Sequence, residues 1–283
     1  MIPAPTLRAA GMVTLVVAAL LGSAYALGRS LVPTEAPPRS TGITASVNSP
    51  HYADQPPADD APATASPSPT PDGDSHPPNG TGDGPYGSRV STGSEQIALT
   101  FDDGPDPRYT PQVLALLREH GVKATFCVVG QNAQDHPDLI QAIVAEGHTL
   151  CNHSWSHDIT LGKRSPDAIR ADLLRTNDAI RAAVPDARIA YFRQPGGAWT
   201  YPVVSVCEEL GMAPLHWTVD PSDWQAPGAA KITNAVLSEV GPGSIVLMHD
   251  AGGDRTGTVD ALQRLLPTLL DRYRLEAMPT GTT

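Results

Sequence analysis

The sequence predicts an α/β fold with a parallel sheet that closes into a barrel. Strand and helix signals alternate from residue 97 to the end of the chain and give about seven β/α units, which is the pattern of a parallel sheet covered by helices. The strand signals are short apolar runs bounded by Gly and Pro, as expected for buried parallel strands. The composition changes sharply near residue 90, so one domain is expected behind a non-globular leader.

The leader is predicted to have two parts. Residues 1–30 contain an uncharged apolar run, residues 9–27, which is about long enough to cross a bilayer. The run ends in Ala-Tyr-Ala at residues 24–26, so a cleaved signal peptide and an uncleaved membrane anchor are both open. Residues 31–93 are rich in Pro, Ser, Thr, Asp, Gly and Ala and predict a disordered spacer. The domain, residues 94–283, is therefore expected to be extracellular, or anchored to the outer face of the cell membrane within the cell wall.

The elements of the domain follow from local signals. Strands are predicted at residues 97–101, 124–129, 148–151, 188–193, 213–219, 244–249 and 273–277. Thr110 and Pro111 predict a helix start, and Gly121 predicts its end. Ser165 followed by Pro166 starts another helix in the same way. The remaining helices are predicted at residues 137–146, 202–210, 229–239 and 258–270.

Charge and cysteine content exclude several classes. The net charge of −11 argues against nucleic-acid binding, because no basic patch is available to neutralise phosphates. Three cysteines are too few for a disulfide scaffold, and no Cys-x-x-Cys spacing predicts a cysteine zinc site.

Polar residues at the predicted strand ends suggest a metal site. Asp102 and Asp103 end the first strand, where an α/β barrel places its chemistry, although Asp-Asp-Gly-Pro is also an ordinary polar turn. His153 and His157 are spaced to converge on one side of a helical turn; the alternative is a pair of surface histidines. With Asp103 they form a set of two histidines and one carboxylate, which suits Zn²⁺ or another late first-row divalent ion.

Three later strands also end in groups that can transfer protons or bind charge. They are Arg193 after the fourth strand, the run from Asp220 to Trp224 after the fifth, and His249 after the sixth. Each alone could be a capping or loop residue. Together with Asp102 and Asp103, they indicate a catalytic pocket, because all these strand ends meet at one face of a barrel.

Five motifs give the chain a family resemblance. They are TFDDGPDP at residues 100–107, HSWSH at 153–157, RQPGG at 193–197, DPSDW at 220–224 and LMHD at 247–250. The sequence resembles a polysaccharide deacetylase domain of carbohydrate esterase family four over about residues 96–277. The resemblance implies a distorted (β/α)7 barrel that removes acetyl groups from sugars with one divalent metal, Zn²⁺ first and Co²⁺ or Ni²⁺ as alternatives.

The resemblance also implies catalytic roles. Asp102 is expected to be the general base, with Arg193 as its charge partner. Asp103, His153 and His157 are expected to bind the metal. His249 is expected to be the general acid, with Asp223 as its hydrogen-bond partner.

Three further residues are expected to contact the substrate. The backbone N–H of Gly196 would bind the oxyanion of the tetrahedral intermediate. Trp224 and Leu247 would wall the pocket for the acetyl methyl group; ordinary core packing is the alternative. Gly196 departs from the family, which commonly has an aromatic residue there, so the substrate preference is open.

Cys127 and Cys151 also depart from the family, which has apolar residues or Gly at these positions. They fall on two strands that are expected to be neighbours. A disulfide and a pair of small buried hydrophobic side chains are both open for an exported protein.

The predicted function is removal of N-acetyl groups from N-acetylglucosamine units of an extracellular polysaccharide. Peptidoglycan is the first expected substrate and chitin oligomers are the second. An acetyl-xylan esterase would have the same machinery and remains the alternative, and a barrel that binds wall glycans without catalysis is a remote one. We expect a monomer that binds polysaccharide, with anchoring to the membrane left open.

Overall fold

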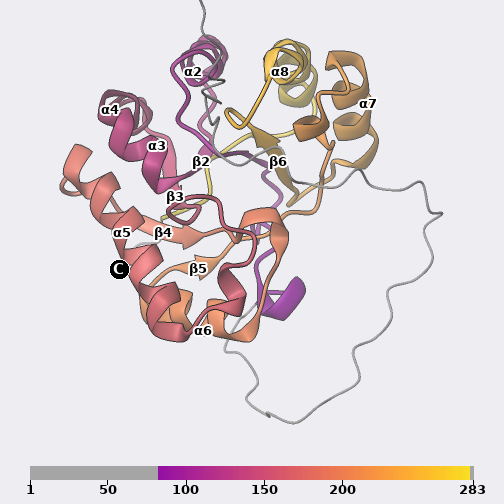
Figure 1. Cartoon of the computed structure of the whole chain (residues 1–283). Helices are drawn as coiled ribbons and strands as arrows, with labels where there is room; N and C mark the ends of the chain where they lie inside the picture. Colours follow the sequence, from indigo (N-terminus) through magenta and orange to yellow (C-terminus); the bar gives the residue numbers. More distant parts are fainter. Residues whose placement is uncertain (1–81, 281–283) are drawn as a thin grey trace, which may run out of the picture. The chain divides into compact units, whose positions relative to one another are not determined.

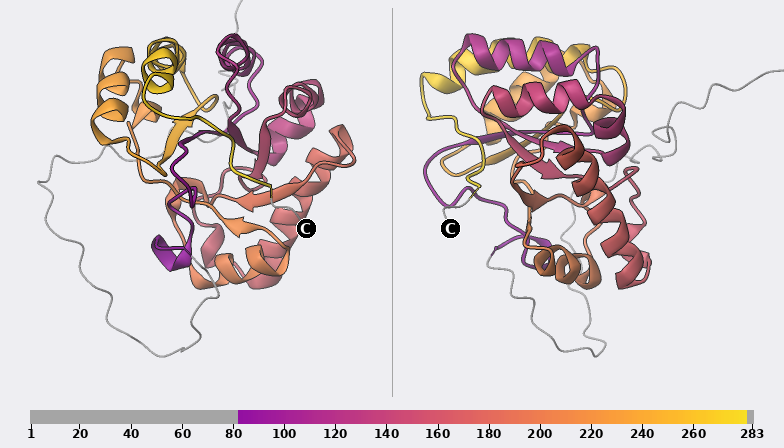
Figure 2. Two further views of the ribbon diagram at one scale, coloured as in Figure 1. Left: turned by 180° about the vertical axis from the view of Figure 1, so that it is seen from behind. Right: turned by 90° about the vertical axis from the view of Figure 1, so that its left-hand side faces the viewer.

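The computed structural model describes residues 82–280, which form a curled, wholly parallel sheet surrounded by helices (Figure 1). The order of the strands in the sheet is β5-β4-β3-β2-β1-β6. The strands are β1 (Ala98–Asp102), β2 (Thr125–Val128), β3 (Thr149–Asn152), β4 (Ile189–Phe192), β5 (Ala213–Pro214) and β6 (Ile245–His249). The helices are α2 (Thr110–Glu119), α3 (Gly130–Asp135), α4 (Pro137–Ala145), α5 (Pro166–Ala183), α6 (Tyr201–Glu209), α7 (Ala229–Glu239) and α8 (Thr256–Leu270). Views from behind and from the side show the same outer layer of helices (Figure 2).

The segment from residue 213 to 219 closes the sheet into a distorted barrel, which confirms the predicted fold class. The sequence predicts one continuous strand here, but only Ala213 and Pro214 pair with β4. The chain then crosses the gap, and Val219 bridges to Val246 of β6. One segment has to pair with two different edges, so it bends between them and cannot remain a regular strand.

The predicted last strand, residues 273–277, is reduced to a single bridge between Leu275 and Ile97. The described residues therefore contain six strands in one sheet. The chain after α8 does not add a seventh strand but packs against the ends of two others. The backbone of Met278 bonds with the hydroxyls of Thr125 and Thr149, at the amino ends of β2 and β3. Residues 275–280 thus form a floor across the end of the barrel opposite the carboxyl ends of the strands.

Side chains alternate between two cores because successive strand residues face opposite sides. The larger core lies between the sheet and the helices and includes Leu99 and Phe101 of β1. The smaller core fills the barrel and consists of Ala98, Cys127, Cys151, Tyr191, Leu215, Ile245 and Met278. Cys127 and Cys151 are paired in register and form a disulfide inside the barrel, so the bridged alternative is the one observed.

Residues 82–93, which the sequence assigns to the spacer, pack against the folded domain. Residues 82–93 belong to the described structure, and Ser88 is fully buried. The N–H of Arg89 donates to the carbonyl of Pro214, and the N–H of His216 donates back to Arg89. This segment orders because β5 is an edge strand with free backbone groups to pair. The earlier part of the spacer and the apolar run of residues 9–27 lie outside the described residues. Among residues 82–280, no helix has both the length and the apolar character required of a membrane span.

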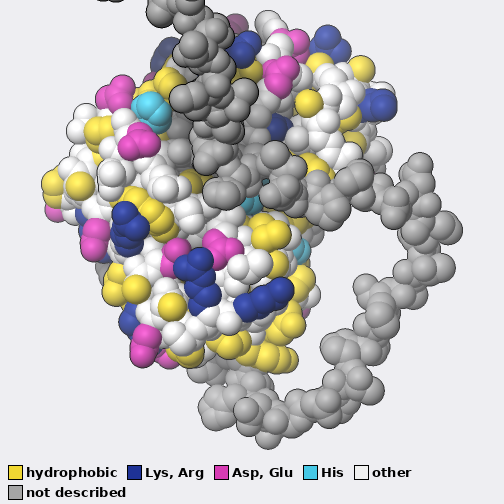
Figure 3. Space-filling view, viewed as in Figure 1, with side chains coloured by type: hydrophobic (Ala, Val, Ile, Leu, Met, Phe, Trp, Pro, Cys, Tyr) yellow, Lys and Arg dark blue, Asp and Glu magenta, His cyan; other side chains and the backbone are white. Residues whose placement is uncertain are grey.

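The short helix α3 is absent from the predicted elements, because Gly130 directly follows the predicted strand at residues 124–129. The helix start predicted at Thr110 and Pro111 is confirmed, since α2 begins at Thr110. The Thr110 hydroxyl donates to the buried carboxylate of Asp250 at 2.5 Å. On the face shown in Figure 3, acidic and basic side chains are interspersed, without a large patch of either sign.

Candidate active site

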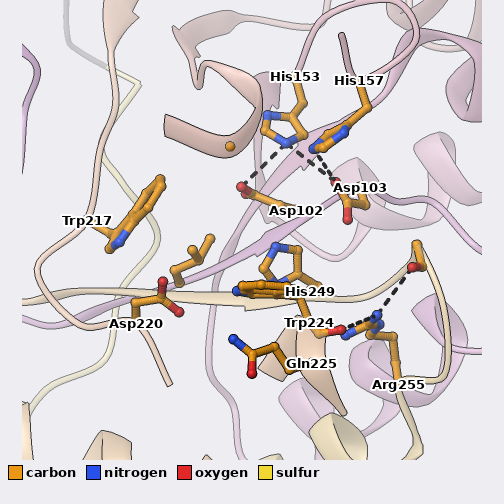
Figure 4. Close-up of a pocket in the computed structure, with 13 residues that line it drawn as sticks. Asp102, Asp103, His153, His157, Trp217, Asp220, Trp224, Gln225, His249 and Arg255 are labelled. Atoms are coloured by element: carbon orange, nitrogen blue, oxygen red, sulfur yellow. Dashed lines mark hydrogen bonds and ion pairs between the residues drawn. The ribbon is translucent and has the colours of Figure 1, made fainter. Parts of the chain in front are cut away.

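A pocket of about 370 Å³ opens at the carboxyl ends of the strands (Figure 4). Its lining residues come from several strand ends and the loops that follow them. They are Asp102, Asp103, His153, His157, Gly196, Trp217, Asp220, Trp224, Gln225, Leu247, His249, Gly252 and Arg255. The structure therefore brings the predicted site residues to one place, with Arg193 and Asp223 buried directly behind the pocket wall.

Asp102 and Asp103 both face this pocket because the backbone changes conformation between them. In a regular strand, adjacent side chains point to opposite faces, so only one of the two carboxylates would reach the pocket. Asp102 is the last residue of β1, and Asp103 adopts a left-handed conformation with φ of 78°. This conformation is uncommon for a residue other than Gly. It turns the second carboxylate toward the same side as the first.

Asp103, His153 and His157 form a cluster that fits a metal ion. Asp103 Oδ1 lies 3.4 Å from Nε2 of each histidine, and one ligand atom from each residue falls within 4.8 Å of the others. Asp103 Oδ1 is buried and has no hydrogen-bond partner within residues 82–280, which is costly unless a ligand satisfies it. Burial raises the pKa of Asp103, but the positive charge that His157, His153 and His249 carry when protonated outweighs it and holds the pKa well below its usual range. The donor set fits a divalent ion such as Zn²⁺.

The two histidines come together as predicted, but the backbone between them is an irregular turn and not the helical turn that the spacing predicts. Residues 153–157 form no helix, and Ser154 and His157 have positive φ of 63° and 55°. His153 Nδ1 lies 2.8 Å from the carbonyl oxygen of Arg193. Since a carbonyl can only accept, Nδ1 carries the proton and Nε2 is left to bind a metal. Burial lowers the pKa of His157, which also favours a neutral ligand.

Arg193 compensates the charge of Asp102. Its side chain is fully buried, and Nη1 donates to Asp102 Oδ1 at 2.6 Å and to Thr100 Oγ1 at 2.8 Å. The other guanidinium hydrogens are directed to the carbonyl oxygens of Leu215 and His216. Removing either partner of this buried ion pair would leave the other charge uncompensated. The structure thus places Arg193 where the resemblance implied.

His249 and Asp223 form a dyad on the other side of the pocket. His249 Nδ1 lies 2.7 Å from Asp223 Oδ1, while the His249 N–H and the Thr258 hydroxyl both donate to Asp223 Oδ2. Burial lowers the pKa of His249, but the charge and hydrogen bond of Asp223 outweigh it and raise the pKa to about 9. The imidazole is therefore held as a cation at neutral pH, with Nε2–H available to the pocket.

Gly196, Trp224 and Leu247 all line the pocket, as predicted. Gly196 has φ of 60°, and a Cβ built on it would lie 3.3 Å from the Ile159 side chain. Ile159 thus occupies part of the space that a larger side chain at position 196 would need. Trp224 and Leu247 are placed in the pocket lining and not only in the core.

Five other lining residues were not predicted to have a role: Trp217, Asp220, Gln225, Gly252 and Arg255. Asp220 could have been found, since it begins the DPSDW motif. Arg255 has no comparable signal in the sequence. Its guanidinium donates to the backbone carbonyls of residues 223, 224 and 252, and every residue type has such a carbonyl.

Fold and pocket together define a class: α/β barrels with their chemistry at the carboxyl edge of the sheet. Comparison with known proteins identifies the family. Residues 89–215 match the polysaccharide deacetylase family. A chitooligosaccharide deacetylase from Sinorhizobium fredii is 45% identical over 204 residues, which cover 68% of this chain and 94% of that protein. The chain belongs to the polysaccharide deacetylases, carbohydrate esterase family four.

Solved structures agree with this assignment. The Bc1960 peptidoglycan N-acetylglucosamine deacetylase matches with a TM-score of 0.64 and 35% identity, over 68% of this chain and 90% of that one. A CE4 family pseudoenzyme from Bacillus anthracis matches with a TM-score of 0.61 and 30% identity, over 65% of this chain and 64% of that one.

Proposed function

We propose that this protein is a divalent-metal-dependent N-deacetylase that acts on N-acetylglucosamine units of an extracellular polysaccharide. Peptidoglycan is the first substrate that we propose, and chitin oligomers are the second. The names of similar proteins support both: one is a chitooligosaccharide deacetylase, and another is a peptidoglycan N-acetylglucosamine deacetylase.

One observation carries the proposal: two adjacent carboxylates in the same pocket differ in their main partners. Asp102 is ion-paired with Arg193 at 2.6 Å and lies 3.6 Å from His153, whereas Asp103 Oδ1 lies 3.4 Å from both imidazoles and finds no hydrogen-bond partner among the described residues. A carboxylate paired with a cation suits a general base, and a carboxylate that faces two imidazoles suits a metal ligand. Asp103, His153 and His157 would hold the ion, which when bound would polarise the acetyl carbonyl and lower the pKa of water.

The protein's own groups provide the proton transfers. Asp102, which is ion-paired with Arg193, accepts a proton from the water that attacks the acetyl carbon. The backbone N–H of Gly196 stabilises the oxygen on which negative charge develops. His249 donates its Nε2 proton to the leaving nitrogen, and Asp223 stabilises the imidazolium beforehand. Trp224 and Leu247 give the methyl group an apolar wall.

The proposal includes a location outside the cell membrane. The uncharged run of residues 9–27 would be a signal or an anchor, and the spacer would let the barrel reach into the wall. The disulfide between Cys127 and Cys151 supports this, because disulfides persist mainly in oxidising compartments.

The decisive experiment measures acetate release from peptidoglycan, chitin oligomers and acetylated xylan side by side. We expect release from the first two, loss of release after metal chelation, and recovery when Zn²⁺ is returned. Faster release from xylan would favour the esterase alternative. Absence of release from all three substrates by the metal-loaded protein would favour a non-catalytic barrel, as in the similar pseudoenzyme. Normal turnover by metal-stripped protein would refute the metal dependence.

A further inference from the structure

A four-residue segment at the start of α3 contacts both loops that provide the metal ligands. The N–H of Gly130 donates to the carbonyl oxygen of Ser154 at 2.9 Å, and the N–H of Gln131 donates to that of Trp155 at 3.0 Å. These two bonds hold the turn between His153 and His157. The segment thus fixes the histidine loop from its backbone.

The same segment holds the loop that contains Asp103. The N–H of Val129 donates to the carbonyl oxygen of Gly104 at 3.0 Å, and Asn132 Nδ2 donates to the carbonyl oxygen of Asp103 itself at 2.7 Å. Residues 129–132, which we call the ligand clamp, therefore connect the aspartate loop to the histidine loop. Asn132 is the one member that makes its contact through a side chain.

The aspartate loop needs such support because its backbone is unfavourable. Asp103 has φ of 78°, and residues held in such conformations persist only when their surroundings determine them. The bond from Asn132 fixes the peptide plane that follows Asp103. That plane and the left-handed φ together decide where the carboxylate points, and hence its 3.4 Å separation from each imidazole.

We infer that Asn132 is a positioning residue of the metal site: its amide holds Asp103 in the conformation that binds the ion. Residues that hydrogen-bond to the ligands of a metal site commonly contribute about 10- to 100-fold to metal affinity, because they hold the ligands in the binding orientation. The inference rests on the metal site proposed above, but not on the identity of the glycan.

The test is direct titration of the metal-free protein with Zn²⁺ in competition with a chromophoric chelator. Asn132→Ala and Asn132→Leu both remove the donor, and Leu also keeps the volume filled. We expect the dissociation constant to rise about tenfold in both variants. We also expect kcat to approach the wild-type value at saturating Zn²⁺, because excess metal refills the site.

Gln141→Ala provides a matched control. Gln141 also donates from a side-chain amide to a backbone carbonyl, that of Ala183 at 3.1 Å. Gln141 lies in α4, its bond joins α4 to α5, and it is not among the residues that line the pocket. We expect it to lower the free energy of unfolding without changing Zn²⁺ affinity.

Unchanged affinity in both Asn132 variants would overturn the inference. So would loss in Asn132→Ala alone, which would indicate packing, or an equal loss in Gln141→Ala, which would indicate general destabilisation. Failure of the wild-type protein to bind Zn²⁺ would instead refute the metal site itself, and the inference with it.

Discussion

Replacing Asp223 by Asn should abolish the cationic character of His249. The pKa of about 9 exceeds the ordinary imidazole value of 6.5 by an amount that corresponds to ~3 kcal/mol in favour of the charged form. Since burial acts in the opposite direction, removing the carboxylate should lower the pKa to 6.5 or below. At pH 7.5 an imidazole with the ordinary value is protonated in only about one molecule in ten. Most molecules of the variant would then lack the general acid.

The assay is a pH titration of the His249 ring protons by NMR in the metal-free protein. We expect an inflection near pH 9 in the wild type and at or below 6.5 in Asp223→Asn. Asp220→Asn is the matched control, because Asp220 lines the same pocket but has no hydrogen bond to His249 among those observed in the described chain. It should lower the inflection less than Asp223→Asn does, because Asp220 interacts with His249 through charge alone.

The stability of the protein should follow the same protonation. A folded-state pKa above the unfolded value stabilises the fold below pH 6.5, and this contribution disappears as the pH rises through about 9. Urea unfolding should therefore show that Asp223→Asn has lost most of this pH dependence. An inflection near 9 in the variant would refute the role of Asp223, and an inflection at 6.5 in the wild type would refute the dyad altogether.

Three other predictions address the base, the disulfide and a histidine outside the pocket. Asp102→Asn and His153→Ala should each lower acetate release at least about 100-fold while circular dichroism shows a folded protein; retained turnover would contradict the assigned roles. Replacing Cys127 and Cys151 together by Ala should lower the free energy of unfolding by about 3 kcal/mol, since the bridge closes a loop of 24 residues; an unchanged urea midpoint would count against it. Burial lowers the pKa of His148 to about 4, so the protein should lose up to ~3 kcal/mol of stability as the pH falls from 6.5 toward 4, and His148→Asn should lose less.

Much of the site could be predicted because its residues end strands. Asp102, Arg193 and His249 each follow an apolar run, and a parallel sheet brings such ends to one edge whatever the details of the loops. The roles of individual residues came from the motifs and not from this geometry. The pocket confirms that the residues come together, while their roles stay predictions until the variants are measured.

Other features depend on contacts that a sequence does not reveal. The two adjacent carboxylates share one pocket only because of the left-handed backbone at Asp103, and nothing in Asp-Asp-Gly-Pro specifies that rotation. The helix α3 has six residues and no apolar period, so it gives no signal of its own. The fifth strand breaks because its two ends pair with different neighbours, which is a property of barrel closure and not of residues 213–219.

The floor of the barrel is closed by a loop and not by a strand. Met278 is fully buried against the disulfide and Tyr191, yet it belongs to a segment without regular secondary structure. Its observed polar contacts include the hydroxyls of two threonines and, through Pro279, the hydroxyl of Tyr191. Segments held by so few bonds open locally at a lower cost than the sheet itself. Brief opening of this segment would admit water or a small reductant to Cys127 and Cys151 from the amino ends of the strands. The sheet and the pocket at its carboxyl edge would keep their structure.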